Sequence, residues 1–183
     1  MARLPDLDKA TLSAEQKVVY DAIARGPRGN VRGPLAVWLR RPGLAAKAQE
    51  LGEYCRYNSS LSKPLSELAI LVTARAWSSE FEWFAHKKHA LNAGVSPEIV
   101  EAIRTCLTPV FADPEEKVVY EVALAMCTHR RLHNALYTSA IAVLGEGRLV
   151  DLIGVLGYYS LISMTINAFE VDVPAGESPE LDA

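Results

Sequence analysis

The chain has 183 residues, of which 50% are hydrophobic and 22% are charged, and its formal net charge at pH 7 is -3. This composition is that of a globular protein, and the length fits one domain with a sizeable hydrophobic core. The weak negative charge excludes the extended basic surface that nucleic-acid binding needs, so no nucleic-acid partner is predicted.

Helix start and stop signals divide the chain into a series of helices. Ser13, followed three residues later by Gln16, predicts a helix start, and Gly26 with Pro27 predicts its end. Further starts are predicted at prolines that can occupy a first helical turn, and one further end at a glycine: Pro42, Pro64, Pro97, Pro114 and Gly94. The sequence contains no alternating strand pattern bounded by hairpin turns. The predicted fold class is therefore all-α.

The stretch SSEFEWFAHKKH, residues 78–89, concentrates acids, aromatics and histidines at one predicted helix start. Ser79 and Glu82 have the spacing of a capping box, which would account for both residues structurally. It does not account for His86, which shares a helix face with them because three- and four-residue spacings stack. Three aromatic side chains flank that face: Phe81, Trp83 and Phe84. A carboxylate and an imidazole four residues apart in such surroundings can exchange protons near neutral pH.

A metal site is the competing interpretation of the same stretch. Glu82, His86 and His89 do not form the HExxH grouping of zinc enzymes, and two lysines between the histidines indicate a solvated side. No metal is therefore predicted. His129 and His133 also share a helix face, but the arginines between them are typical of a polar helix end or loop.

The cysteines and the N-terminal residues indicate the cellular compartment of the protein. The three cysteines, Cys55, Cys106 and Cys127, are far apart and form no CxxC, as expected of reduced thiols in a cytoplasmic protein. The N-terminal text MARLPDLDKATLS lacks the apolar core of a signal peptide. A cytoplasmic location is therefore predicted.

Residues 152–169 carry no charge and approach the length of a membrane span. Glycines and polar residues interrupt this run, however, and a helix buried all round in a bundle or subunit contact has the same composition. We predict no membrane partner. Because a monomer would expose apolar surface of this run to water, a homo-oligomer is predicted instead.

The sequence also contains an internal echo. The first repeat pairs EQKVVYDAIA at residues 15–24 with EEKVVYEVAL at 115–124. A weaker repeat pairs LSELAILVTARAW at 65–77 with LVDLIGVLGYYSL at 149–161, and it aligns Glu67 with Asp151. Such repeats indicate a copied helical unit packed on itself. We predict a single domain over residues 1–183, with copies at about 13–105 and 113–171 and a loosely held tail at 172–183.

The residues from Glu67 to Gly94 resemble the carboxymuconolactone decarboxylase family, which also contains the alkylhydroperoxidase D-type peroxidases. The family signature is a Glu in an ELAIL-like helix, followed about twelve residues later by a helix start that ends in His. Glu67 stands in that text here, and Ser79-x-x-Glu82-x-x-x-His86 occupies the positions where the peroxidase branch has Cys-x-x-Cys-x-x-x-His. WSSEFEWFAH is similar to the decarboxylase-type version, and the resemblance extends from about Arg32 to Val171.

The resemblance implies a duplicated all-α helical bundle that assembles into trimers or hexamers, with a role in the catabolism of aromatic compounds. It implies a cofactor-independent lyase or isomerase for a small acidic, lactone-like substrate. In the decarboxylase reaction this substrate loses carbon dioxide and the resulting enolate is protonated, while double-bond migration and lactone opening would need the same kind of acid/base pair. His86 would donate the proton or stabilise the charge, Glu82 would set the charge of His86, and Glu67 would hold it or relay a proton.

Binding residues follow from the same reasoning. Arg75 is the cation nearest in sequence for an acidic substrate, although a helix-surface role explains it equally well. Tyr57 and Asn58, in the text RYNSSL, are predicted to line the cavity. Ser79 and Trp83, next to the catalytic residues, complete the predicted substrate-binding set.

Two alternative functions remain open at this point. A thiol-type peroxidase would need a reactive cysteine pair, which the Ser79 and Glu82 positions do not supply. A non-catalytic helical binding protein would keep the fold without the chemistry, and a fully packed volume around His86 would favour that alternative.

Overall fold

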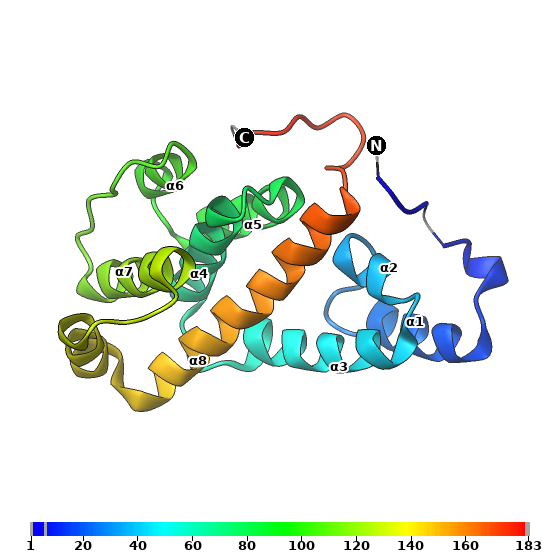
Figure 1. Cartoon of the computed structure of the whole chain (residues 1–183), viewed down its shortest axis with the longest axis horizontal. Coiled ribbons are helices and arrows are strands. Elements are labelled where there is room, and N and C mark those ends of the chain that lie inside the picture. Colours follow the sequence, from blue (N-terminus) through cyan, green and yellow to red (C-terminus); the bar gives the residue numbers. More distant parts are fainter. Residues whose placement is uncertain (1, 6, 182–183) are drawn as a thin grey trace.

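The computed structural model describes residues 2–5 and 7–181, and within them the chain is helical with no strand, which confirms the all-α fold class (Figure 1). The elements are one 3₁₀ turn, η1 (Lys9–Thr11), one π-helical turn, η2 (Tyr54–Asn58), and the helices α1 (Ala14–Arg25), α2 (Pro34–Trp38), α3 (Pro42–Glu53), α4 (Lys63–Ala76), α5 (Glu80–Ala93), α6 (Pro97–Arg104), α7 (Pro114–His129) and α8 (Asn134–Phe169).

The predicted helix starts are confirmed by their capping geometry. Ser13 and Gln16 form a reciprocal capping box, in which the Gln16 amide donates to Ser13 Oγ (3.2 Å) and the Ser13 amide donates to Gln16 Oε1 (2.9 Å). Proline occupies the first turn of α3, α4, α6 and α7. Gly94 ends α5 in the left-handed region, with φ of 103°, where glycine is favoured.

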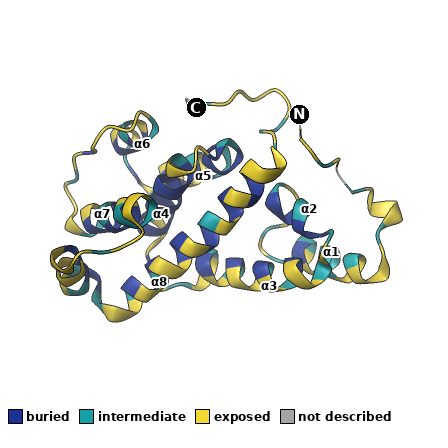
Figure 2. Cartoon of the chain, in the orientation of Figure 1, coloured by how far each residue is buried: buried dark blue, intermediate teal, exposed yellow. Residues whose placement is uncertain are grey.

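Helix α4 is the centre of the core. Every residue from Leu65 to Ala74 is buried, because α5, α7 and α8 pack around this helix. Figure 2 shows the buried positions of α4 and α5 facing the inner side of α8. A helix buried on all sides must satisfy its polar groups internally, and Thr73 does so by donating its hydroxyl to the Ala69 carbonyl at 2.9 Å. Glu67 therefore lies in the most enclosed part of the protein.

Helix α8 contains the predicted apolar run. Gly145, with φ of 76° and ψ of 167°, interrupts the helix near its first third. Among the described residues, α8 is the one helix whose length and composition would suffice to cross a membrane, and 56% of its most apolar window is buried inside the protein. That burial is typical of a core helix.

The two KVVY segments lie near the starts of α1 and α7. Val118 and Val119 in α7 are buried against the core, whereas Val18 in α1 is 70% exposed. The same four residues therefore occupy two different environments within one chain. The duplication and its boundaries remain predictions.

The C-terminal tail crosses α5. The backbone amides of Glu180 and Leu181 donate to the Glu80 carboxylate at 2.9 and 2.8 Å, and Glu180 Oε2 accepts from Trp83 Nε1 at 3.2 Å and from Lys87 Nζ at 2.5 Å. The Leu181 side chain is buried. The expectation of a loosely held tail is therefore wrong for its last described residues, because polar and apolar contacts both anchor them.

Candidate active site

The three predicted catalytic side chains meet in one cluster. His86, in α5, lies with Nδ1 2.6 Å from Glu67 Oε2 and with Nε2 2.9 Å from Glu82 Oε1. All three side chains are almost fully buried, with 0% of Glu67, 3% of Glu82 and 3% of His86 exposed. A single imidazole therefore has a carboxylate on each ring nitrogen.

Local helix geometry explains this arrangement. Glu82 and His86 are four residues apart on α5, so their side chains lie on the same face. Helices α4 and α5 are joined only by residues 77–79, and such a short connection makes the two helices pack against each other. Glu67 lies nine residues before the end of α4 at Ala76, and His86 lies six residues after the start of α5. The 2.6 Å contact between the two side chains shows that these positions lie at the same level of the helix pair.

The capping-box interpretation of Ser79 and Glu82 is wrong. Ser79 is the N-cap residue of α5, but its side chain makes no capping hydrogen bond. The Glu82 carboxylate is directed to His86 instead of to the Ser79 backbone. Ser79 Oγ is buried and has no hydrogen-bond partner among the described residues.

The electrostatics favour a charged imidazole. Burial alone would lower the pKa of His86, but the charges of Glu82 and Glu67 and their hydrogen bonds outweigh it, so the pKa is raised above its ordinary value. Burial likewise acts to raise the pKa of Glu67, but the hydrogen bond and charge of His86, with Lys63 and Arg56, bring it below the ordinary value. Both shifts favour an imidazolium at His86 paired with a carboxylate at Glu67.

A cavity of about 430 Å³ opens beside this cluster, and His86 and Glu82 form part of its wall. The protein as a whole is acidic, yet four basic side chains line this cavity: Arg28, Arg32, Arg56 and Lys63. They come from the loop before α2, from η2 and from the first residue of α4. The cavity is therefore a local concentration of positive charge next to an acid/base group.

Three of these basic groups have no carboxylate partner. Among the described residues, no acid lies within ion-pair distance of Arg28, Arg32 or Arg56, whereas Lys63 Nζ lies 3.4 Å from Glu67 Oε1. Arg28 instead donates to the neutral side chains of Gln49 (3.3 Å) and Tyr158 (3.2 Å).

Arg56 is held with part of its guanidinium out of solvent. Its Nε atom is buried without a hydrogen-bond partner in the described part of the chain, and its guanidinium lies 5.4 Å from the centre of the Tyr57 ring. Unpaired guanidinium groups at a cavity wall favour an anionic ligand, because burial makes an unmet donor costly.

The loop that carries Arg32 packs directly on α5. Gly33 has φ of 59°, and a Cβ atom there would lie 2.5 Å from Cε1 of Phe81, an aromatic residue of the same cavity wall. Any larger residue at position 33 would clash with this ring, so glycine is required for the close approach. This contact places Arg32 at the cavity.

The structure places one of the predicted binding residues at the cavity wall and the others away from it. Tyr57 lines the cavity. Asn58 and Ser79 are not among its lining residues, and the Asn58 side chain donates to the Glu53 carbonyl at 3.5 Å. The π-helical turn therefore directs Tyr57 into the cavity and its neighbour Asn58 away from it.

Arg75 and Trp83 are also absent from the cavity wall. Arg75 donates from Nε to the Arg104 carbonyl at 2.9 Å and from Nη1 to Ser78 Oγ at 3.2 Å, so it joins α4 to the end of α6. The Trp83 ring is buried on the other side of α5, where Nε1 donates to Glu180. The structure therefore assigns the cationic wall to residues that are distant in sequence from Arg75.

Sequence reasoning missed most of the basic wall. Arg28 and Arg32 belong to the segment GPRGNVRGP, whose glycines and prolines indicate a loop, but nothing in this segment predicts its contact with α5. His89 also lines the cavity, with its ring centre 5.7 Å from that of His86. Arg56, directly before Tyr57, was the residue that the sequence could have indicated.

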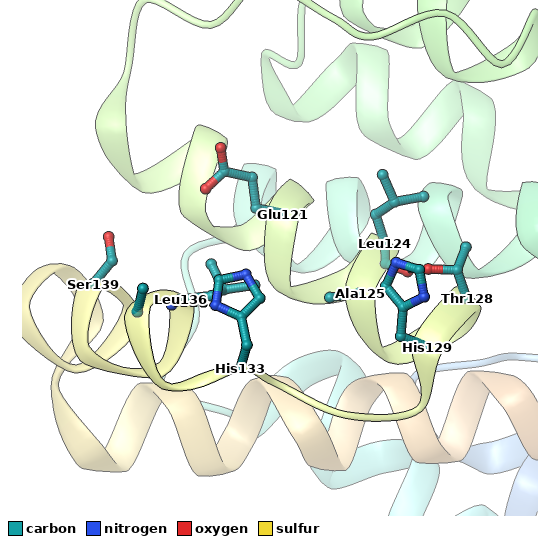
Figure 3. Close-up of a pocket in the computed structure, with 9 residues that line it drawn as sticks. Glu121, Leu124, Ala125, Thr128, His129, His133, Leu136 and Ser139 are labelled. Atoms are coloured by element: carbon teal, nitrogen blue, oxygen red, sulfur yellow. Dashed lines mark hydrogen bonds between the residues drawn. The ribbon is translucent and has the colours of Figure 1, made fainter.

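A larger hollow of about 680 Å³ lies between α7 and the start of α8 (Figure 3). His129 is the last residue of α7, and His133 caps α8 by accepting the Leu136 amide on Nδ1 at 3.2 Å. The prediction that these histidines belong to a polar helix end is confirmed. The hollow is open and has no carboxylate–imidazole pair like that at His86, so its greater size does not make it the reaction site.

No group of three or more histidine, cysteine or acidic side chains suited to hold a metal ion occurs in the described part of the chain.

Comparison with known proteins relates the segment that contains the cluster to one family. Residues 42–125 match the model of the carboxymuconolactone decarboxylase family, and this segment contains Glu67, Glu82 and His86. No curated protein matches the sequence significantly. The fold is similar to that of an uncharacterized peroxidase-related protein from Silicibacter sp. TM1040, with a TM-score of 0.76 and 16% identity over 95% of this chain and 92% of that one.

The debrominase Bmp8 has a similar fold as well. Its apo structure gives a TM-score of 0.74 at 13% identity over 93% of this chain and 91% of that one. A cysteine-to-alanine variant of Bmp8 in complex with 2,3,4-tribromopyrrole gives 0.76 at 13% identity over 96% and 95%. At these identities the structural likeness concerns the fold alone. Residues 42–125 therefore carry a match to the carboxymuconolactone decarboxylase family, and the helical fold of the whole chain is similar to that of a peroxidase-related protein.

Proposed function

We propose that the protein is a cofactor-independent acid/base lyase that acts on a small acidic, lactone-like molecule. The observation that carries this proposal is the position of His86: its imidazole is held between two carboxylates at the wall of a cavity lined by unpaired guanidinium groups. The cavity volume of about 430 Å³ leaves room for a small ligand next to the imidazole, which favours catalysis over a non-catalytic helical protein.

The first step of the proposed reaction uses the basic wall. Arg32 and Arg56 bind the substrate carboxylates, and this fixes the substrate with its breaking bond next to Glu82 and His86. The bond between the leaving carboxylate and the ring carbon breaks, and carbon dioxide departs without its bonding electrons. Those electrons pass into the conjugated carbonyl of the lactone, so a dienolate forms. Basic side chains around the cavity stabilise this negative charge.

The second step is proton transfer to the dienolate carbon. The proton leaves His86 Nε2, either directly or through Glu82, whose carboxylate accepts from that nitrogen at 2.9 Å and also lines the cavity. Glu67 on Nδ1 fixes the ring orientation and stabilises the imidazolium before transfer. A proton taken from water then restores His86, and the hydroxide left behind combines with the released carbon dioxide as bicarbonate, so the cycle needs no other reactant.

The thiol peroxidase alternative lacks its reactive group. Ser79 and Glu82 stand where the peroxidase branch of the family has its two cysteines. Cys55 is 1% exposed, and burial raises the pKa of its thiol to about 11, so little thiolate forms at neutral pH. The related debrominase structure contains a small substituted ring compound, which supports a small ring substrate for this fold.

The decisive measurement is carbon dioxide release from 4-carboxymuconolactone by the intact protein, by His86→Gln and by His129→Gln. We expect release by the intact protein and by the His129 variant, because His129 lies at the end of α7 outside the cavity. Loss of the proton donor in His86→Gln should lower the rate by about a hundredfold or more. Undiminished release by His86→Gln would exclude His86 as the proton carrier, and no release by the intact protein would exclude this lactone as substrate.

A further inference from the structure

The cavity wall includes a π-helical turn that a single distant carboxylate holds in place. Element η2, Tyr54–Asn58, continues α3 directly after Glu53 and brings Arg56 and Tyr57 to the cavity. Such turns are rare and occur frequently at functional sites. A turn with this irregular hydrogen bonding needs support from elsewhere in the fold to keep a single conformation.

Asp151 of α8 supplies that support at both ends of the turn. Its Oδ1 accepts from the Tyr54 hydroxyl at 2.7 Å, and its Oδ2 accepts from the Ser60 amide at 2.7 Å and from the Ser60 hydroxyl at 2.5 Å. Tyr54 is the first residue of η2, and Ser60 follows its last residue by two positions. Three hydrogen bonds to one carboxylate thus close the segment 54–60 against α8.

The position of Arg56 depends on this closed segment. Cys55, the preceding residue, is buried in the core, and the Arg56 guanidinium has no ion-pair partner of its own in the described chain. The guanidinium lies over the Tyr57 ring, which is also part of the turn, and it lines the cavity. The backbone of the turn therefore decides where the guanidinium lies.

We propose that Asp151 is a positioning residue for the anion-binding wall of the cavity, acting through Tyr54 and Ser60 on Arg56. This inference rests on the proposed function in one respect, namely that Arg56 binds the acidic substrate. Asp151 lies outside the segment 42–125 that carries the family match, so a residue of the C-terminal part of the chain supports a turn that lies within this segment.

His89 provides a reporter that does not depend on any substrate. Burial lowers the pKa of His89, and the positive charge of Arg56 lowers it further, together with His86 and Lys63, while Glu67 acts in the opposite direction. If Asp151→Asn releases the turn, Arg56 moves away and the pKa of His89 rises towards its ordinary value. Loss of the Asp151 charge by itself would act in the opposite direction, because a removed anion makes protonation less favourable.

The experiment is an NMR titration of the four histidines in the intact protein and in matched variants. We expect the pKa of His89 to rise in Arg56→Gln, in Asp151→Asn and in Ser60→Ala, which keeps the Asp151 charge but removes one of its hydrogen bonds. Asp21→Asn, which removes a carboxylate on the surface of α1, should leave it unchanged. A His89 pKa that rises in Arg56→Gln but not in Asp151→Asn or Ser60→Ala would overturn the proposal.

A kinetic measurement separates this inference from the proposed function. If the intact protein releases carbon dioxide from 4-carboxymuconolactone, Asp151→Asn should raise KM about tenfold with little change in kcat, since it weakens binding and leaves the proton donor in place. An unchanged KM would contradict the positioning role. If the intact protein releases none, that lactone fails as the substrate, while the His89 titration still decides the role of Asp151.

Discussion

His86 Nδ1 and Glu67 Oε2 lie 2.6 Å apart although the two residues are separated by 19 positions in the chain, and both side chains are buried. A hydrogen bond this short between an imidazolium and a carboxylate is charge-assisted. Because α4 and α5 are packed core helices, neither partner can move away without disturbing the core. The pair therefore links the stability of the fold to the protonation of the site.

The first prediction concerns stability as a function of pH. The pKa of His86 is raised on folding, so its contribution is fully present below its ordinary pKa of about 6.5 and is lost as the pH rises through the raised value. The pKa of Glu67 is lowered, so its contribution is present above about 4.3 and is lost as the pH falls through the lowered value. We expect the Tm to be highest between these limits.

Calorimetry from pH 3 to pH 9 checks this expectation. The decline of Tm on the alkaline side should be smaller in His86→Gln, which has no proton to lose, while His129→Gln should behave like the intact protein. An identical alkaline decline in His86→Gln would mean that another group is responsible.

The second prediction assigns anion binding to the residues of the cavity wall. Arg32→Gln and Arg56→Gln should each weaken the binding of 4-carboxymuconolactone about tenfold or more, because a hydrogen bond to a charged group contributes roughly 1.5–3 kcal/mol. Arg75→Gln is the matched control, since that side chain joins Arg104 and Ser78 outside the cavity. Calorimetric titration in the His86→Gln background avoids turnover. A larger loss in Arg75→Gln than in the other two would restore Arg75 as the binding cation.

The third prediction separates the lyase from a thiol enzyme. Burial raises the pKa of both Cys55 and Cys127, so neither thiol is an effective nucleophile at neutral pH. Replacing Cys55 by Ala and both Cys106 and Cys127 by Ser should leave carbon dioxide release within about twofold of the intact protein. Peroxide consumption with a dithiol reductant is measured in parallel. Consumption that disappears in the cysteine-free variant would instead support the peroxidase alternative.

The fourth prediction is self-association through α8. Four apolar side chains form one exposed stripe of this helix: Val150 (70% exposed), Ile153 (37%), Leu161 (36%) and Met164 (50%). Family resemblance implies a trimer or hexamer, and a homo-oligomer would cover this stripe. Light scattering after gel filtration should give a multiple of the 20.0 kDa chain mass.

A matched pair of variants tests the surface involved. Met164→Lys should lower the oligomer mass, because a buried unpaired charge is costly at an interface. Val110→Lys, in a loop where that residue is 92% exposed, should leave the mass unchanged. A monomeric mass for the intact protein at micromolar concentration would contradict the prediction.

Local rules predicted the helices well, and they predicted that Glu82 and His86 share one face of a helix. Capping at Ser13 and the prolines in the first turns are properties of neighbouring residues, so the sequence specifies them without reference to the rest of the fold. The Glu82–His86 pair follows from helical spacing in the same way. The Glu67 contact could be expected only from the family resemblance, since nothing local fixes how α4 packs against α5.

Two errors show where local rules fail. Glu82 has two possible partners, the backbone at Ser79 and the imidazole at His86, and spacing alone does not choose between them. The structure chooses the imidazole, because the charges and hydrogen bonds of Glu82 and Glu67 favour its charged form and outweigh the opposite effect of burial. Arg75 is close to the site in sequence but joins α6 instead. The basic wall comes from segments that meet only through long-range packing, which a single sequence does not reveal.

The anchoring of both ends of the chain has a consequence for its connectivity. The Ala2 amide donates to Asp172 at 2.8 Å, and the Arg3 amide donates to the Phe169 carbonyl at 3.0 Å, so the first residues lie where the C-terminal tail begins (Figure 1). A tail of about ten residues extends at most about 35 Å from that point, so a linker of similar length can return to it. Circular permutation is therefore geometrically possible. Opening the chain in the exposed loop near Val110 would give a protein in which the second predicted copy is synthesised before the first.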